Sequence, residues 1–362
     1  MTAGYVKSKD RGRTEKFREK IRKLARGEDL TIMHISGGHE LSISKQGIRS
    51  VLPPEINIVG GLCCTACVTP THHIQEAIEI SEKEDVTLAT FGDMIGVPGN
   101  SKHLARDTKS VRVVNSMAEA LDMAKKQDRE VVFFGIGFEA TAATYAPILL
   151  EEPDSFSFLG SVKRIPPFIE FLLRSGEVDV DGLLAPGLPS TITGPGPYQQ
   201  LAEKYNIPII IAGIEPLDIL YAITVFLKFL RAGSKPRALN AYPGAVKREG
   251  NKKAIEMMDR AFESNDACWR GIGTISDSGL RVKEDKLNAR GKFEVKVQRE
   301  EAETLTTGFC NEILWGRSKP DMCEYFRDGE CTPHDPRGPW MAGWKGICSI
   351  WYRYHISSPV RV

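Results

Sequence analysis

The stretch Val131-Val-Phe-Phe-Gly-Ile-Gly-Phe-Glu-Ala-Thr141 shows the pattern that decides the fold. A short apolar run ends in a glycine-containing turn, and a helical pattern of residues follows. A continuous apolar run of this length is typical of a strand buried on both faces, as in a parallel sheet. The same succession recurs between residue 31 and about residue 240. The other apolar runs begin at Leu30, Ile56, Val86, Val111, Phe156, Gly182 and Pro208.

Eight strands that alternate with helices predict an α/β fold with parallel sheets. Two sheets of about four strands each are favoured, and a single eight-stranded barrel is the alternative. The polar stretch 123–130 predicts a boundary between a first α/β domain at residues 31–125 and a second at residues 126–240.

The two ends of the chain do not follow this pattern. Residues 1–30 contain apolar side chains at helical spacing and predict an amphipathic helix. After residue 240 the strand–helix alternation stops, so residues 241–362 predict a loop-rich third domain that contains cysteines. The N-terminal helix is expected to pack on that third domain.

The composition limits the class of protein. The chain has 362 residues, 41% hydrophobic and 26% charged, as in soluble proteins of two or three domains. Its net charge of +1 gives no general attraction to nucleic acid or to an anionic membrane. No apolar run approaches the ~20 residues that span a bilayer, and the first residues lack the apolar segment of a secretory signal. The expected location is the cytoplasm.

Four cysteines near the C-terminus predict a metal centre. Cytoplasmic cysteines stay reduced, so four thiols within about forty residues are more easily explained by a metal than by disulfides. Structural zinc usually takes close cysteine pairs, whereas long, uneven spacings suit a [4Fe–4S] cluster. Zinc and four unmetallated core thiols are the alternatives. The expected cluster ligands are Cys310, Cys323, Cys331 and Cys348.

A second group of cysteines follows the apolar run at residues 56–59. Cys64 and Cys67 form a Cys-x-x-Cys motif at the start of a predicted helix, where the helix N-terminus stabilises a thiolate. Such a pair can cycle between dithiol and disulfide or bind a soft metal. Tight packing of small residues is the structural alternative. Cys63 adds a third thiol that could compete in the exchange.

Other loops after strands carry candidate residues for binding or acid–base chemistry, because the ligand sites of open parallel sheets lie beyond the carboxyl ends of the strands. These candidates are Ser36 and His39 in Ser36-Gly-Gly-His39, with Glu139 and Glu215 in two further glycine turns. Each loop alone is also compatible with ordinary turn chemistry. The sequence contains neither a Walker A loop nor a Gly-x-Ser-x-Gly elbow.

Taken together, these motifs resemble one family, that of the hydrogenase maturation factor HypD. The resemblance extends from about residue 30 to residue 355. Its motifs include Ser36-Gly-Gly-His39, Cys64-x-x-Cys67-Val-Thr-Pro70, Thr90-Phe-Gly-Asp93, Val132-Phe-Phe-Gly-x-Gly-Phe-Glu139, Ala212-Gly-x-Glu215-Pro-Leu-Asp218 and the four terminal cysteines.

The resemblance implies two related α/β domains and a third domain with a [4Fe–4S] cluster. It also implies a scaffold that builds the Fe(CN)2CO unit of [NiFe]-hydrogenase on transiently bound iron. The partners implied are a small HypC-like chaperone and a HypE-like cyanide donor.

The chain departs from the family in its first loop. The family has Cys-Gly-Gly-His-Thr-His there, and its cysteine is regarded as an iron ligand, whereas this chain has Ser36. A serine hydroxyl is a poor ligand for iron that carries cyanide and CO. Three functions therefore stay open. The chain could still assemble Fe(CN)2CO, with a replacement ligand among His34, His39 and the thiols of Cys63, Cys64 and Cys67. It could instead be a paralogue that uses cluster and dithiol to reduce or assemble a different substrate or metal unit. The third possibility is a non-catalytic binding subunit.

Overall fold

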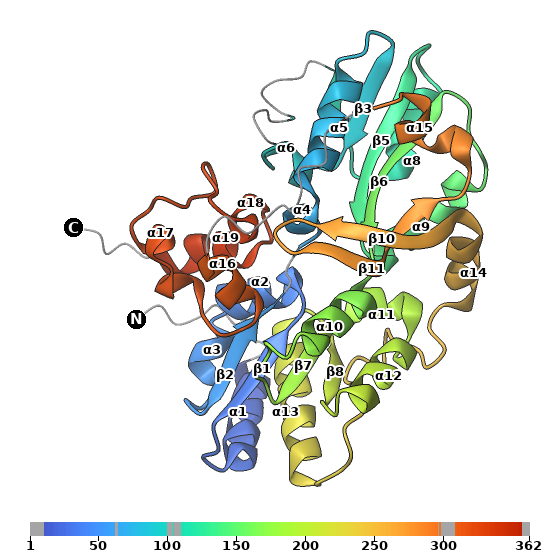
Figure 1. Cartoon of the computed structure of the whole chain (residues 1–362). Coiled ribbons are helices and arrows are strands. Elements are labelled where there is room, and N and C mark those ends of the chain that lie inside the picture. Colours follow the sequence, from blue (N-terminus) through green and yellow to red (C-terminus); the bar gives the residue numbers. More distant parts are fainter. Residues whose placement is uncertain are drawn as a thin grey trace.

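The structure is a computed structural model that describes residues 11–61, 64–99, 104, 110–295, 297 and 308–356. Its strands form two sheets, which are the centres of two lobes (Figure 1). The first sheet is parallel throughout and has the order β2-β1-β7-β8-β9. Its strands are β1 (Leu30–His34), β2 (Ile56–Gly60), β7 (Gly182–Pro186), β8 (Ile209–Ala212) and β9 (Ala238–Asn240).

The second sheet has the order β10-β11-β6-β5-β3-β4. Strands β3 to β6 are parallel, and an antiparallel hairpin of β10 and β11 joins them along β6. The strands are β3 (Val86–Thr90), β4 (Val111–Val113), β5 (Glu130–Gly137), β6 (Phe156–Lys163), β10 (Phe262–Trp269) and β11 (Gly273–Val282).

The two sheets are built alike. The first four strands of each sheet, counted in chain order, are β1, β2, β7 and β8 in the first sheet and β3, β4, β5 and β6 in the second. In both sheets they lie side by side in the order 2-1-3-4, and the later strands extend the sheet beyond the fourth. This is the order of a doubly wound sheet, with a change of winding direction between its first and third strands. The prediction of two related α/β domains with parallel sheets is confirmed, together with all eight predicted strands.

The predicted domain boundaries at 31–125 and 126–240 are wrong. The first sheet takes its strands from residues 30–60 and 182–240, and the second takes its strands from residues 86–163 and 262–282. The polar stretch 123–130 therefore lies inside the second lobe. A polar turn shows only that the chain is at the surface; it does not show which sheet the next strand joins.

The predicted third domain and its contact with the N-terminal helix also need correction. Residues 262–282 belong to the second sheet, so the cysteine region starts at residue 308 within the described part of the chain. Helix α1 (Arg11–Ala25) packs along α13 (Pro216–Arg231) of the first lobe (Figure 1). The Arg231 guanidinium fixes it by donating to the carbonyl oxygens of residues 24 and 25, at 2.7 and 2.6 Å.

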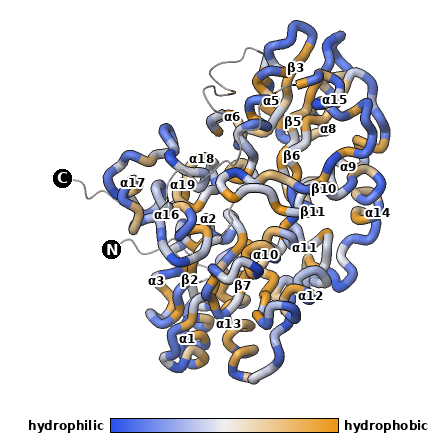
Figure 2. The backbone as a smooth tube through the Cα atoms, in the orientation of Figure 1, coloured by the Kyte–Doolittle hydropathy of each residue, from blue (hydrophilic) through white to orange (hydrophobic). Residues whose placement is uncertain are grey.

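Helices cover the faces of both sheets. The strands are largely hydrophobic and the outer turns hydrophilic (Figure 2). The helices of the first lobe, with α1 and α13, are α2 (Gly37–Lys45), α3 (Ile48–Val51), α11 (Gly187–Thr193) and α12 (Gly196–Lys204). Those of the second lobe are α5 (Thr71–Ser81), α6 (Gly92–Ile95), α8 (Met117–Ala124), α9 (Glu139–Leu149), α14 (Lys252–Ala261), η1 (Asp285–Leu287) and α15 (Ala289–Lys292). Two helices connect the lobes, namely α4 (Thr65–Val68) and α10 (Ile165–Arg174).

The cysteine region consists of short helices and loops. Its elements are α16 (Gly308–Leu314), η2 (Pro320–Met322), α17 (Glu324–Arg327), α18 (Pro339–Ala342), α19 (Ile347–Trp351) and η3 (Tyr352–Ile356). It lies beside α2 of the first lobe and beside α4, which connects the lobes (Figure 1). One continuous apolar core links its buried residues with the inner parts of both sheets. This junction of three parts brings the candidate residues together.

Candidate functional site

The four C-terminal cysteines line one small cavity. They come from separate segments, namely α16, the residue before α17, the loop after α17, and α19. All four are buried, and none takes part in a disulfide. Aromatic and apolar side chains, among them Phe326, Trp340 and Met341, complete the lining. The structure thus brings together four residues that the sequence had only placed in the same segment.

The four thiols do not form a ready-made group around one metal position. Within the described residues, no three or more histidine, cysteine, aspartate or glutamate side chains form a group that could hold one ion. Tetrahedral zinc needs four sulfurs at about 2.3 Å from one centre. Four cysteines that line one cavity provide the donor set of a [4Fe–4S] cluster as well as that of tetrahedral zinc.

Two hydrogen bonds in the wall of the cavity involve these cysteines. The backbone N–H of Arg337 donates to the sulfur of Cys331 at 3.3 Å, and burial raises the pKa of that thiol. Hydrogen bonds to cysteine sulfur are among the features that tune an iron–sulfur cluster. The Trp340 indole donates to the carbonyl oxygen of Cys310 at 2.8 Å and fixes one wall of the cavity.

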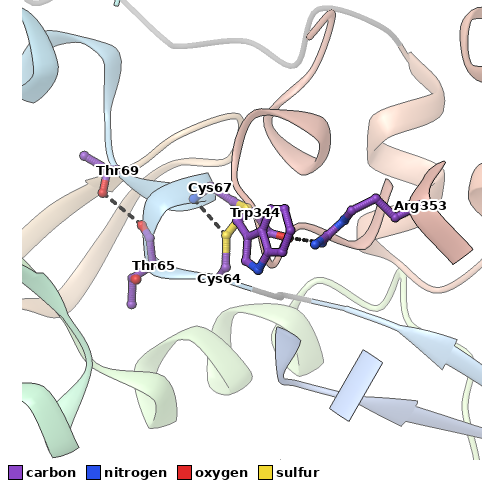
Figure 3. The surroundings of a disulfide bond; sticks show 6 residues. All are labelled: Cys64, Thr65, Cys67, Thr69, Trp344 and Arg353. Carbon is purple, nitrogen blue, oxygen red and sulfur yellow. Dashed lines mark hydrogen bonds between the residues drawn. A yellow bond between two sulfur atoms is a disulfide. The ribbon is translucent and has the colours of Figure 1, made fainter. Parts of the chain in front are cut away.

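Cys64 and Cys67 form a disulfide at the start of α4 (Figure 3). Cys64 is the N-cap residue of this helix, and the Cys67 N–H donates to its sulfur at 3.1 Å. In the reduced state, that N–H would stabilise a thiolate on Cys64. Both residues are buried, at 6% and 0% exposure. Cys63 lies outside the described residues.

The disulfide packs against the cysteine region. A Cβ atom placed on Gly343 would lie 2.6 Å from the Cys64 sulfur and 2.7 Å from the Cys67 sulfur, and one on Gly346 would lie 2.9 Å from the Cys67 sulfur. These glycines belong to the loop between α18 and α19. In the same loop, Trp344 lies next to the disulfide, and its carbonyl oxygen accepts from Arg353 (Figure 3). Two residues after Gly346 the chain reaches Cys348, so the disulfide is next to a segment that lines the cavity.

The first loop positions Ser36 as a helix cap. The Ser36 hydroxyl accepts from the N–H of Gly38 at 3.1 Å at the start of α2. Serine is a favoured residue at this position because its oxygen satisfies a backbone N–H that lacks a helical partner. His39 in the first turn is fully buried, and its Nε2 donates to the carbonyl oxygens of Ala212 and Gly213 at 3.2 and 3.1 Å. Burial and the neighbouring His34 lower the pKa of His39 to about 4, so the ring is neutral at pH 7.

A buried ionic network lies directly behind this loop. The Glu40 carboxylate accepts from His34 Nε2 at 2.8 Å and from both terminal nitrogens of Arg49, each at 2.8 Å. It also accepts from the Trp351 indole at 2.9 Å, which connects α2 to α19 of the cysteine region. Although burial acts in the opposite direction, Arg49 and His34 hold the pKa of Glu40 well below its usual range. Sequence reasoning did not select Glu40, Arg49 or Trp351, although Glu40 lies next to His39.

The two remaining candidates lie in different places. Glu215 is exposed at the N-terminus of α13, close to the first loop, because Gly38 packs against Ile214. Glu139 belongs to the second lobe, where its Oε1 accepts from the N–H of Ile165 at 2.8 Å. Burial raises the pKa of Glu139 to about 7. Ser36, His39 and Glu215 therefore lie in the same part of the first lobe, whereas Glu139 belongs to the connection between the lobes.

Comparison with known proteins places this architecture among hydrogenase maturation proteins. A putative hydrogenase expression/formation protein of Methanocaldococcus jannaschii is 40% identical over 355 residues, which cover 95% of this chain and 98% of that protein. The HupD protein of Azotobacter chroococcum, described as a hydrogenase expression/formation protein, is 33% identical over 89% of each chain. The hydrogenase maturation factor HypD of Escherichia coli is 32% identical over 90% of this chain and 89% of its own length.

A family profile identifies the particular family. The profile described as "HypD: Hydrogenase formation hypA family" matches residues 13–355. The chain therefore belongs to the HypD family, and its role lies in hydrogenase maturation together with other maturation proteins. Among the described residues, no helix has both the length and the apolar character needed to cross a membrane.

Proposed function

We propose that this protein is a cytoplasmic metallocofactor assembly scaffold. It carries a [4Fe–4S] cluster on Cys310, Cys323, Cys331 and Cys348, and it uses Cys64 and Cys67 as a redox-active pair. The observation that supports this proposal most is the packing of the disulfide against Gly343 and Gly346, in the loop that leads to Cys348. The two redox groups would be separated by one short loop of protein.

The chemistry of the pair follows from its surroundings. Reduction of the disulfide breaks the S–S bond and takes up two electrons and two protons, which gives two thiols. The cluster, when bound, supplies single electrons that originate from an external reductant. The protein excludes water from the disulfide and holds the Cys67 N–H against the Cys64 sulfur, so Cys64 is the thiol that is more easily ionised.

The cargo is iron that carries cyanide and CO, as the HypD family membership suggests. A small HypC-like chaperone would bind this iron together with the scaffold, and a HypE-like protein would deliver cyanide. The position of Ser36 as a helix cap favours a second candidate, a paralogue that uses the same cluster and dithiol on a different metal unit, because the hard hydroxyl is already engaged with Gly38.

Reconstitution without oxygen tests the cluster. The parent protein is expected to bind about four irons and four sulfides per chain, and Cys323→Ser should lose most of both. Cys268→Ser is the matched control, because Cys268 lies in the second sheet, outside the cavity, and its replacement should leave the cluster intact. One zinc per chain without acid-labile sulfide would contradict the proposal.

Alkylation tests the redox pair. Cys64 and Cys67 should resist labelling in the oxidised protein and become labelled when the cluster is reduced, and Cys348→Ser should abolish this dependence.

Infrared spectroscopy of the protein purified with a HypC-like partner distinguishes Fe(CN)2CO from a different metal unit as the cargo. Bands of cyanide and CO support Fe(CN)2CO assembly, and iron without such bands supports the paralogue.

A further inference from the structure

We propose that the second lobe carries a binding site for a small anion, whose phosphate or carboxylate group is held by Lys163 and Arg290. The site is a cavity of about 560 Å³ between β6, the β10–β11 hairpin, the first turn of α5 and α15. Its volume lies within the range of roughly 300–1,000 Å³ that is usual for small-molecule sites. The cysteines proposed for the cluster and for the redox pair do not line this cavity, so the inference goes beyond the proposed function.

The cavity exists because the hairpin departs from β6. Strand β11 pairs with Val162 and Lys163, at the end of β6. The register of the hairpin itself shifts between Asn265 and Ala267. An irregularity of this kind bends a strand, as β-bulges next to functional sites do. The earlier part of β6 therefore faces the cavity, and Gly160 belongs to the lining.

Lys163 places a cation on the floor of the cavity. Its side chain is 2% exposed, and the ammonium group lies 5.7 Å from the centre of the Trp269 ring. This cation–π contact holds the side chain against the wall. Water and salt screen a buried charge much less than an exposed one. A cation in this position therefore attracts an anionic group more strongly than a surface lysine does.

Arg290 adds a donor that lacks an acceptor. Its Nε donates to Glu76 at 2.7 Å and its Nη1 to the carbonyl oxygen of Gly160 at 2.9 Å, which fixes the guanidinium plane. Its Nη2 is buried and has no hydrogen-bond partner among the described residues. A buried N–H without a partner costs free energy. An oxygen of a phosphate or a carboxylate supplies the acceptor that a guanidinium group matches best.

The distribution of charge in the lining favours an anion at the floor. The charged side chains of the lining are Lys163, Arg281, Arg290 and Asp266. Each arginine is paired with a glutamate outside the lining. Asp266 is exposed at the mouth, where water screens its charge, whereas Lys163 is buried. The imidazoles of His72 and His73 and the hydroxyl of Ser161 add polar groups that can donate to an anion.

Titration calorimetry of the full chain with pyrophosphate and with citrate, at low ionic strength, tests the site. We expect one anion to bind per chain, with an affinity that falls as salt is added. Binding of pyrophosphate alone identifies phosphate as the group that is held, and binding of citrate alone identifies a carboxylate. If neither anion binds to the parent, the proposal is overturned.

Two variants locate the binding. Lys163→Met keeps an unbranched side chain but removes the charge, and it should weaken binding about tenfold or more. Thr274→Glu changes an exposed residue at the mouth, which avoids any disturbance of the core, and its carboxylate should repel the anion and weaken binding several-fold.

Thr144→Glu is the matched control, because it makes the same substitution at an exposed residue of α9 outside the cavity. It should bind the anion as the parent does. Parental affinity in both Lys163→Met and Thr274→Glu would overturn the proposal, as would an equal loss in Thr144→Glu and Thr274→Glu. Because anion binding requires neither cluster nor disulfide, these results are independent of the reconstitution and alkylation experiments.

Discussion

Gly343→Ala should separate the disulfide from the cysteine region. The φ angle of Gly343 is −106°, which alanine adopts without backbone strain, so the effect of the new methyl group is purely steric. That methyl would lie 2.6 and 2.7 Å from the two sulfurs, whereas non-bonded heavy atoms prefer about 3.5–4 Å. One side must therefore move by about 1 Å in a buried, packed region.

The expected cost is that of overpacking a core, about 1–3 kcal/mol of the free energy of unfolding. The clash should be smaller in the reduced protein, because two separate thiols can rotate away from the methyl group while the disulfide cannot. Each 1.4 kcal/mol of this difference shifts the ratio of dithiol to disulfide tenfold. We therefore expect Gly343→Ala to favour the dithiol.

Urea unfolding measures the first effect, and alkylation in a glutathione redox buffer measures the second. Gly244→Ala is the matched control, because its Cβ would meet no atom within 4 Å. That control should be neutral or slightly stabilising, by about 0.4–1 kcal/mol. If Gly343→Ala matches the control in stability and keeps the parental fraction of disulfide, the inferred contact between the pair and the cysteine region is refuted.

Three further outcomes follow from the buried charges. The raised pKa of Glu139 means that folding disfavours its ionised form, so its contribution to stability falls as the pH rises from about 4.5 to about 7. Glu139→Gln should therefore gain about 2–3 kcal/mol of unfolding free energy relative to the parent between pH 5 and pH 8. Glu40→Gln should cost about 3–5 kcal/mol, because Arg49 loses its buried countercharge, and urea unfolding at pH 7 measures this loss. Arg231→Ala should release α1, seen as faster amide hydrogen exchange at residues 11–25 with the second lobe unchanged.

The strands could be predicted because burial on both faces requires continuous apolar runs. Strand β8 shows this directly, since all four residues of Ile209–Ala212 are buried. The hairpin β10–β11 escaped prediction because it is antiparallel and partly exposed, so polar residues interrupt its apolar pattern. The exchange of strands between the lobes depends on contacts between residues far apart in the chain, and local periodicity contains no information about it.

The candidate site could be predicted at the level of residue types. A cysteine is a candidate for redox chemistry or metal binding by its residue type alone. Cys64 and Cys67 could also be recognised as a pair because they are close in the sequence. The contact of their sulfurs with Gly343 could not be predicted, because a glycine that makes room for a distant group looks like any loop glycine. The same is true of Trp351, whose indole reaches Glu40 across more than 300 residues of sequence.

Each lobe takes its strands from two separate parts of the chain, so the chain crosses between the lobes more than once. The disulfide lies at one of these crossings, a position that two domains formed one after the other would not provide. After β2 the chain leaves the first sheet, and α4 is the first helix of that crossing, so Cys64 and Cys67 lie where both lobes meet the cysteine region. They share one apolar core with the four cysteines of the cavity. Small thiols in solution must enter that core to attack the disulfide, whereas electrons from the proposed cluster would need to cross only the loop at residues 343–346. If the proposed cluster is bound, burial at this junction therefore favours reduction through the protein over reduction by solvent thiols. The redox state of the proposed scaffold would then follow one electron donor.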